Sequence, residues 1–235
     1  MRAFKRLIRA SSLIALFALT AGLQAAPATS AEQWLNNYYK QPAPEQFSAA
    51  VLELSDSGFF EREGNVPLSI GFLASVFAQN PDRVNEWMDL TRSLPEAHKR
   101  ILVAALWYSG NPKGVDYLRS YSRDSSPALR SQILARVQQP DLANAEVLSA
   151  SSLNLQWGVF LATGEKAPVQ HILAALATTD NAQLSQNVRW SLAQNAAQHQ
   201  RVLAICRDEL SRQPNAVRET LRAVINESEV RQPSS

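Results

Sequence analysis

The segment IGFLASVFAQNPDRVNEWMDLTRSL, residues 70–94, decides the fold class of this chain. Residues 70–78 form an apolar run, and in residues 82–94 the apolar side chains recur at the spacing of one helix face. Asn80 and Pro81 separate the two runs. Asn is a favoured residue at the N-cap of a helix, and proline is tolerated in the first turn because its missing N–H would be unpaired there. The segment therefore predicts two amphipathic helices joined by a short break.

The same pattern extends over most of the chain. Prolines at 67, 81, 95, 112, 127, 168 and 214 each precede or open an amphipathic run, and no run alternates with period two as a strand would. Residues 140–154 are the least regular and are expected to hold at most one short helix. The chain is thus predicted to be all-α, with helices over residues 31–39, 44–58, 70–78, 82–94, 96–108, 115–123, 128–138, 155–163, 169–178, 181–195, 200–212 and 215–228.

Several helix ends resemble one another, which indicates degenerate repeats. Asn80 and Asn111 are 31 residues apart, and so are Gly164 and Asn195, but the interval from Gly110 to Gly164 breaks this period. At the level of fold, this arrangement resembles the HEAT-type and tetratricopeptide-type α-solenoids, in which antiparallel helical hairpins stack. The resemblance implies no catalytic or binding residue, and the tetratricopeptide signature is absent as a set. A compact helical bundle is the alternative architecture.

The first 25 residues have the pattern of a cleavable export signal. Basic residues within 2–9 precede a short apolar core at 12–20 and small residues at 23–26. We therefore expect a signal peptide at 1–25 and a periplasmic location. We also expect an N-terminal helix with a proline-containing link at 26–43, one helical domain at 44–230 and a frayed tail at 231–235. No cysteine follows the small residues, so a lipid anchor is not expected.

Composition argues against several classes of protein. The whole chain carries a net charge of +2, but loss of the signal leaves 19 basic against 21 acidic residues, a net charge of −2. No block of like charge remains, so we expect no nucleic-acid partner. No later apolar run reaches the roughly 20 residues that a membrane-spanning helix needs. Cys206 is the only cysteine, which excludes an intramolecular disulfide, and its helical neighbours predict a buried, inert thiol.

Catalytic and metal-binding patterns are weak. His98, His171 and His199 are isolated in the sequence, and no pair has the spacing of a metal site. We expect His98 at the surface, and we expect the carboxylates of Asp208 and Glu209 to lie in polar surroundings. There is no nucleophile elbow, phosphate loop or dinucleotide motif. The sequence therefore predicts no cofactor and no metal, and it favours a protein without catalytic activity.

Two aromatic patches are the best candidates for binding. Tyr38 and Tyr39 end the first predicted helix, which either caps the helical domain or offers these side chains to a partner. Tyr117 and Tyr121 lie four residues apart on one predicted helix, with Arg123 nearby. The five tryptophans are spread along the chain and are expected to pack between helices.

Two functional hypotheses remain open at this point. The first is a periplasmic interaction or scaffold protein that binds another envelope protein or a peptide through its helical surface. The second is a periplasmic enzyme or small-ligand carrier with a site between helices. An extended groove lined by Tyr, Asn, Gln and Arg favours the first, and a deep pocket with a buried ionisable pair favours the second. The oligomeric state is not indicated.

Overall fold

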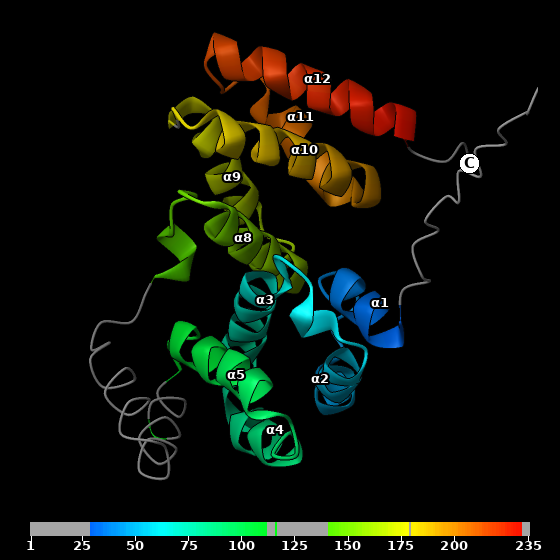
Figure 1. Cartoon of the computed structure of the whole chain (residues 1–235). Helices are drawn as coiled ribbons and strands as arrows, with labels where there is room; N and C mark the ends of the chain where they lie inside the picture. Colours follow the sequence, from blue (N-terminus) through cyan, green and yellow to red (C-terminus); the bar gives the residue numbers. More distant parts are fainter. Residues whose placement is uncertain (1–28, 112–115, 117–140, 179, 232–235) are drawn as a thin grey trace, which may run out of the picture.

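The computed structural model describes residues 29–111, 116, 141–178 and 180–231 (Figure 1). These residues form α-helices with short 3-10 turns and no strand, so the all-α prediction is confirmed. The α-helices are α1 Ser30–Asn37, α2 Phe47–Asp56, α3 Asn65–Gln79, α4 Val84–Leu90, α5 Glu96–Tyr108, α8 Ala150–Thr163, α9 Lys166–Thr178, α10 Ala182–Gln198, α11 Gln200–Glu209 and α12 Asn215–Arg231. The 3-10 turns are η1 Pro44–Gln46, η2 Phe59–Glu61, η3 Pro81–Arg83 and η4 Leu142–Asn144.

Helix α3 lies at the centre of the packing. It contacts α5 on one side and α8 on another, and α8 leads through α9 to the layer of α10, α11 and α12 (Figure 1). Helices α1 and α2 pack together, and α1 also touches α8. The pairing of α3 with α8 joins segments distant in the sequence. The regular solenoid therefore stays a prediction, since the two predicted helices within residues 115–138 lie outside the described residues.

Prolines begin or precede helices, as expected. Pro81 is the first residue of η3, Pro95 is the N-cap of α5, and Pro214 directly precedes α12. Pro67 and Pro168 are the third residues of α3 and α9. Each lies in the first turn, where a missing N–H breaks no intrahelical hydrogen bond. Pro112 and Pro127 lie outside the described residues.

Two helix ends differ from the sequence prediction. The side chain of Asn80 does not cap the following helix, because its Nδ2 donates to the carbonyl oxygen of Val76 at 2.9 Å and so closes α3. Helix α8 begins five residues earlier than predicted. Ser149 and Ser152 form a reciprocal capping box there, in which each side chain accepts a backbone N–H of the other residue.

Helices α3 and α8 cross at two glycines. A Cβ on Gly71 would lie 3.2 Å from the backbone nitrogen of Val159, and closer still to the carbonyl oxygen of Leu155. A Cβ on Gly158 would meet the backbone of α3 in the same way. Small residues let helix backbones approach closely, so this crossing depends on both glycines.

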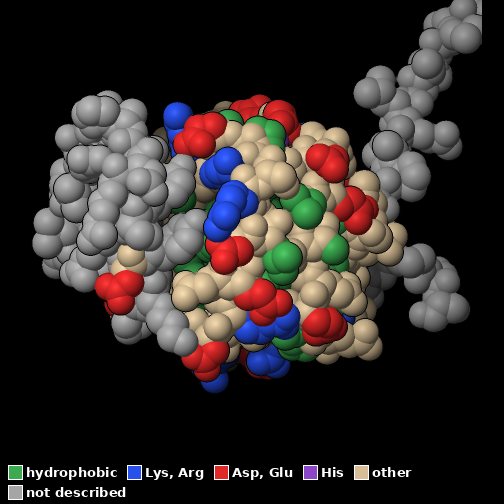
Figure 2. Space-filling view, turned by 90° about the horizontal axis from the view of Figure 1, so that it is seen from below, with side chains coloured by type: hydrophobic (Ala, Val, Ile, Leu, Met, Phe, Trp, Pro, Cys, Tyr) green, Lys and Arg blue, Asp and Glu red, His purple; other side chains and the backbone are tan. Residues whose placement is uncertain are grey.

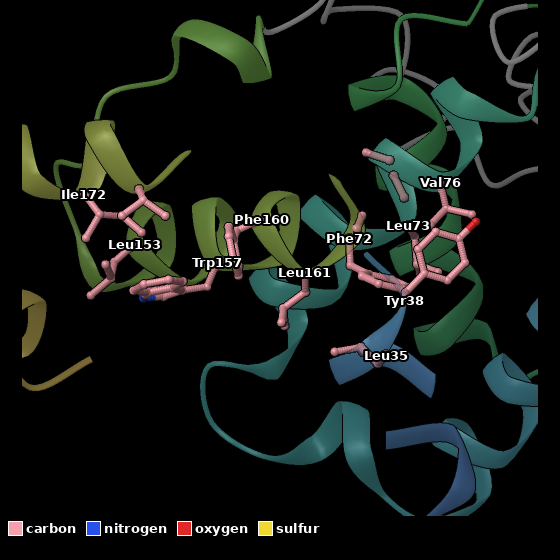
Figure 3. Packing of buried hydrophobic residues seen from close by; sticks show 14 of the residues in the cluster. Leu35, Tyr38, Phe72, Leu73, Val76, Leu153, Trp157, Phe160, Leu161 and Ile172 are labelled. Atoms are coloured by element: carbon pink, nitrogen blue, oxygen red, sulfur yellow. The ribbon is translucent and has the colours of Figure 1, made fainter. Parts of the chain in front are cut away.

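The core runs without interruption through both halves of the chain. Aromatic rings of α3, of α8 and of Tyr38, which directly follows α1, lie along it together with aliphatic side chains (Figure 3). Trp34 of α1 packs edge-on against Phe72 of α3, with ring centroids 5.1 Å apart. At the far end Cys206 is fully buried, and burial raises the pKa of its thiol to about 12. The prediction that this cysteine is buried is confirmed, and its raised pKa favours an inert thiol.

Tyr39 and His199 join α1 to the C-terminal half. The Tyr39 hydroxyl lies 3.3 Å from Nδ1 of His199, and both rings pack against Phe160. The imidazole of His199 is 3% exposed. Burial, with a smaller contribution from the charge of Lys40, lowers the pKa of His199 from 6.5 to about 4. The ring is therefore neutral in the folded protein at neutral pH.

This lowered pKa predicts a stability that falls with acidity. Above pH 6.5 the imidazole is neutral in both states; below it only the unfolded chain takes up the proton, until the folded pKa of about 4 is reached. We expect the His199 contribution to fall by about 2 kcal/mol between about pH 7.5 and about pH 5. Urea unfolding at both pH values should show that His199→Gln loses less stability between them than the unchanged protein does. An equal loss in both proteins would contradict this prediction.

Glu209 has polar and charged neighbours, as expected, although the residue itself is buried. Its residue is only 3% exposed, and Lys166 Nζ lies 2.7 Å from Oε1. Burial alone would raise the pKa of Glu209, but hydrogen bonds from Lys166, Gln170 and Arg212 outweigh it and lower the pKa to about 2. This ion pair network holds the start of α9 against the end of α11.

Candidate functional site

A pocket of about 530 Å³ opens between residues 74–110 and residues 141–168. Its walls come from the C-terminal parts of α3 and α5, from η4, and from α8 and the beginning of α9. The volume lies within the roughly 300–1,000 Å³ that ligand pockets usually have. The apolar lining is supplied mainly by small side chains. The polar side chains that line it include Ser75, Gln79, Tyr108, Asp141, Gln156 and Glu165.

Gln156 is the most unusual of these residues because it is fully buried on the pocket wall. Its Nε2 donates to the carbonyl oxygens of Ala145, at 2.8 Å, and of Leu142, at 3.3 Å. These two bonds hold the segment around η4 against α8. Its Oε1 accepts no hydrogen bond from any described group. A buried acceptor without a partner costs about 1–3 kcal/mol, so this oxygen marks a place where a donor would be stabilised.

A second arrangement resembles a nucleophile, base and acid. The Ser55 Oγ lies 2.8 Å from Nδ1 of His98, and Nε2 of His98 lies 2.8 Å from Oε1 of Glu61. The Phe60 ring packs edge-on against the imidazole. These contacts connect α2, η2 and α5. They also correct the expectation that His98 lies at the surface, since the residue is 7% exposed.

Burial argues against a catalytic role for this cluster. Ser55 is 7% exposed, whereas the Glu61 side chain is 58% exposed. A catalytic serine needs access to substrate and its acid needs shelter, so the exposure here is reversed. The cluster is better explained as a polar contact that satisfies His98 between three elements.

This explanation makes a chemical prediction. A fluorophosphonate probe, which labels activated serines, is expected to leave Ser55 unmodified in the folded protein because the residue is only 7% exposed. Mass spectrometry of the treated protein, with an active serine hydrolase as positive control, checks this. Stoichiometric labelling lost in both Ser55→Ala and His98→Gln would establish a nucleophile instead.

The sequence-predicted binding residues do not meet at the pocket. Tyr38 is 1% exposed and packs against Trp34 and Phe72, so its proposed contact with a partner is corrected to a packing role. Tyr39 is half-buried; its ring lies against Phe160, and its backbone N–H donates to the carbonyl oxygen of Leu161. Tyr117, Tyr121 and Arg123 lie outside the described residues.

Sequence reasoning missed the pocket residues because they come from five separate elements. One signal was present: Gln156 lies beside the apolar residues 157–162, on a helix whose other buried positions are mostly apolar. A polar residue at a core position needs a partner. The tryptophans follow expectation only in part, since Trp87 and Trp157 are buried but Trp190 is 62% exposed.

The described surface outside the pocket carries charges of both signs and a few exposed large hydrophobic side chains, among them Leu148 and Trp190 (Figure 2). Charges of both signs are interspersed on the face shown in Figure 2, with small, separate hydrophobic patches. Within the described ranges, no group of three or more His, Cys, Asp or Glu residues could hold a metal ion. No helix in that same part of the chain is long and apolar enough to cross a membrane. Comparison with protein-family models, curated proteins and solved structures found no match.

Proposed function

We propose that this chain is a non-catalytic interaction protein of the periplasm that binds a segment of another envelope protein in the pocket between α3, α5, α8 and α9. The observation that carries the proposal is the pocket itself, which combines hydrogen-bonding side chains with an unpartnered buried acceptor at Gln156. The pattern of residues 1–25 supports the location. The repeat-like helix ends support a stacked, α-solenoid-like frame with the pocket on it.

Site-specific photo-crosslinking in living cells tests this proposal. A photoreactive amino acid replaces Ala78 or Ala167, two small pocket-lining residues, and, as a matched control, Ala204 on the exposed side of α11. We expect one envelope protein to be captured from both pocket positions and not from Ala204. Equal capture from all three positions would reject the interaction function. So would the absence of any capture when the protein is exported and folded.

A small-ligand carrier is the second candidate, favoured by the pocket volume of about 530 Å³. Native mass spectrometry of the protein released from the cell envelope distinguishes the two. A stoichiometric small molecule, lost when a pocket residue is replaced, would favour the carrier. The protein mass alone, together with pocket-specific crosslinks, would favour the interaction protein.

A further inference from the structure

The buried part of the pocket wall combines an apolar surface with two polar side chains. Its apolar residues come one each from α3, α8 and α9: Ala74, Val159 and Pro168. The polar residues that are buried in the described lining are Ser75 and Gln156. The Ser75 hydroxyl is already paired, since it donates to the carbonyl oxygen of Gly71 at 2.9 Å. A group that enters this part of the pocket therefore meets apolar side chains and the amide of Gln156.

The orientation of the Gln156 amide is fixed by its neighbours. Nε2 lies 2.8 Å from the carbonyl oxygen of Ala145 and 3.3 Å from that of Leu142. Both neighbours are acceptors, so the nitrogen must face them, and exchange of the two amide atoms would place oxygen against oxygen. Oε1 is thereby fixed as an acceptor, and no described group donates to it. The ligand that complements this wall brings one hydrogen-bond donor on an apolar body.

We propose that the pocket binds the indole side chain of a tryptophan on the partner segment, an inference that rests on the interaction function proposed above. The whole hydrogen-bonding capacity of an indole is one N–H donor, so a single bond to Gln156 Oε1 satisfies both groups. A phenol or a primary amide brings further polar atoms, each of which needs a partner when buried. An aliphatic side chain would leave Oε1 without a donor. The bicyclic ring gains apolar contact with Ala74, Val159 and Pro168.

The outer part of the pocket suits the peptide backbone that carries such a ring. Tyr108 of α5 is partly buried there and offers an aromatic ring to the edge or face of the indole. The exposed side chains of Gln79 and Glu165 line the pocket and can bond to peptide groups beside the tryptophan. An apolar centre within a polar rim is the usual arrangement of a protein interface, and tryptophan is enriched among the residues that dominate binding energy.

Binding of defined peptides to the purified full-length protein tests the hydrogen bond. The probes are acetyl-Ala-Trp-Ala-amide, the same peptide with 3-benzothienylalanine in place of tryptophan, and the same peptide with tyrosine. Benzothiophene keeps the bicyclic shape and has sulfur in place of the N–H. By calorimetry or NMR titration, we expect the tryptophan peptide to bind about tenfold more tightly than either of the others. Equal affinities, or no measurable binding of the tryptophan peptide, would overturn the assignment.

A variant of Gln156 assigns the hydrogen bond to its acceptor. Gln156→Leu removes Oε1, and it also releases the two carbonyl groups that Nε2 holds, so the affinities themselves are expected to change. The informative quantity is the ratio of the affinities for the tryptophan and benzothienylalanine peptides. We expect the preference for tryptophan to disappear in this variant. A preference that persists would overturn the role of Gln156.

A second pair of variants places the peptide in the pocket without disturbing the buried wall. Ala78→Phe puts a large side chain on an exposed part of the lining and should weaken the tryptophan peptide by at least about tenfold. Ala204→Phe, on the exposed side of α11, is the matched control and should leave binding unchanged. Equal affinity of both variants for the peptide would place the binding site elsewhere and overturn the proposal.

The two proposals fail separately. Pocket-specific crosslinks to a partner segment that lacks tryptophan would leave the interaction function standing and remove the indole assignment. Preferential binding of the tryptophan peptide without any crosslinked partner in cells would keep the pocket chemistry and reject the interaction function.

Discussion

Gly158→Ala is expected to lower the free energy of unfolding by about 3 kcal/mol, despite the better helix propensity of alanine. The new Cβ would lie 2.7 Å from the backbone nitrogen of Phe72, and closer still to the carbonyl oxygen of Leu68. These are backbone atoms of α3, so no side chain can rotate away to make room. The two helices must separate, which opens the packing around Phe72 and Phe160, both fully buried.

Urea denaturation of the purified protein measures this effect. The matched control is Ala204→Gly on the exposed side of α11, which changes only helix propensity and should cost about 1 kcal/mol. In open space, Gly158→Ala would stabilise the protein by a similar amount. A stabilised or unchanged Gly158→Ala protein would therefore show that α3 and α8 do not cross this closely. Gly71→Ala repeats the test from the other helix, and both variants should behave alike.

Much of the helical framework follows from the sequence because apolar spacing and first-turn prolines are local signals. Residues 70–94 predict a helix, a break and a second helix, and the structure has α3, η3 and α4 there. Helix α8 begins earlier than predicted because its cap is a pair of serines, Ser149 and Ser152, without the acidic residue that usually marks such a start. The sequence indicates less clearly which helices pair when they are far apart in the chain. Gly71 and Gly158 interrupt apolar helices, which indicates close packing but does not name the partner helix.

The candidate site was less predictable, since pocket residues become neighbours only through the α3–α8 pairing. For Tyr38 the difficulty is different, because a local pattern is present but suggests the wrong environment. An aromatic side chain beside a proline-containing link has the pattern of an exposed contact, yet the link folds back and places this ring in the core. Trp34 Nε1 donates to the carbonyl oxygen of Ala43 at 3.1 Å, which anchors the link to α1. Burial of this kind depends on the whole fold and has no local signature.

Deletion of residues 26–43 is expected to lower the free energy of unfolding by more than about 5 kcal/mol, comparable with the whole stability of many domains. The deletion removes Trp34, Leu35 and Tyr38, all buried, and exposes Phe72 and the α8 face to water. It also removes the Tyr39 contact with Phe160 and His199. Large aromatic truncations in a core each cost about 3–5 kcal/mol, so losing several cannot be absorbed by local collapse.

Thermal and urea unfolding of the shortened protein measure this loss, and removal of residues 232–235 is the control deletion at the other end. Trp34→Ala keeps the chain length and should still cost about 3–5 kcal/mol. A binding arm would behave differently: stability would change by less than about 1 kcal/mol, while crosslinking to the partner would disappear. Because α1 supplies core side chains and contacts both α2 and α8, we expect the first result. The N-terminal helix then belongs to the folded domain itself, and partner recognition must come from another surface.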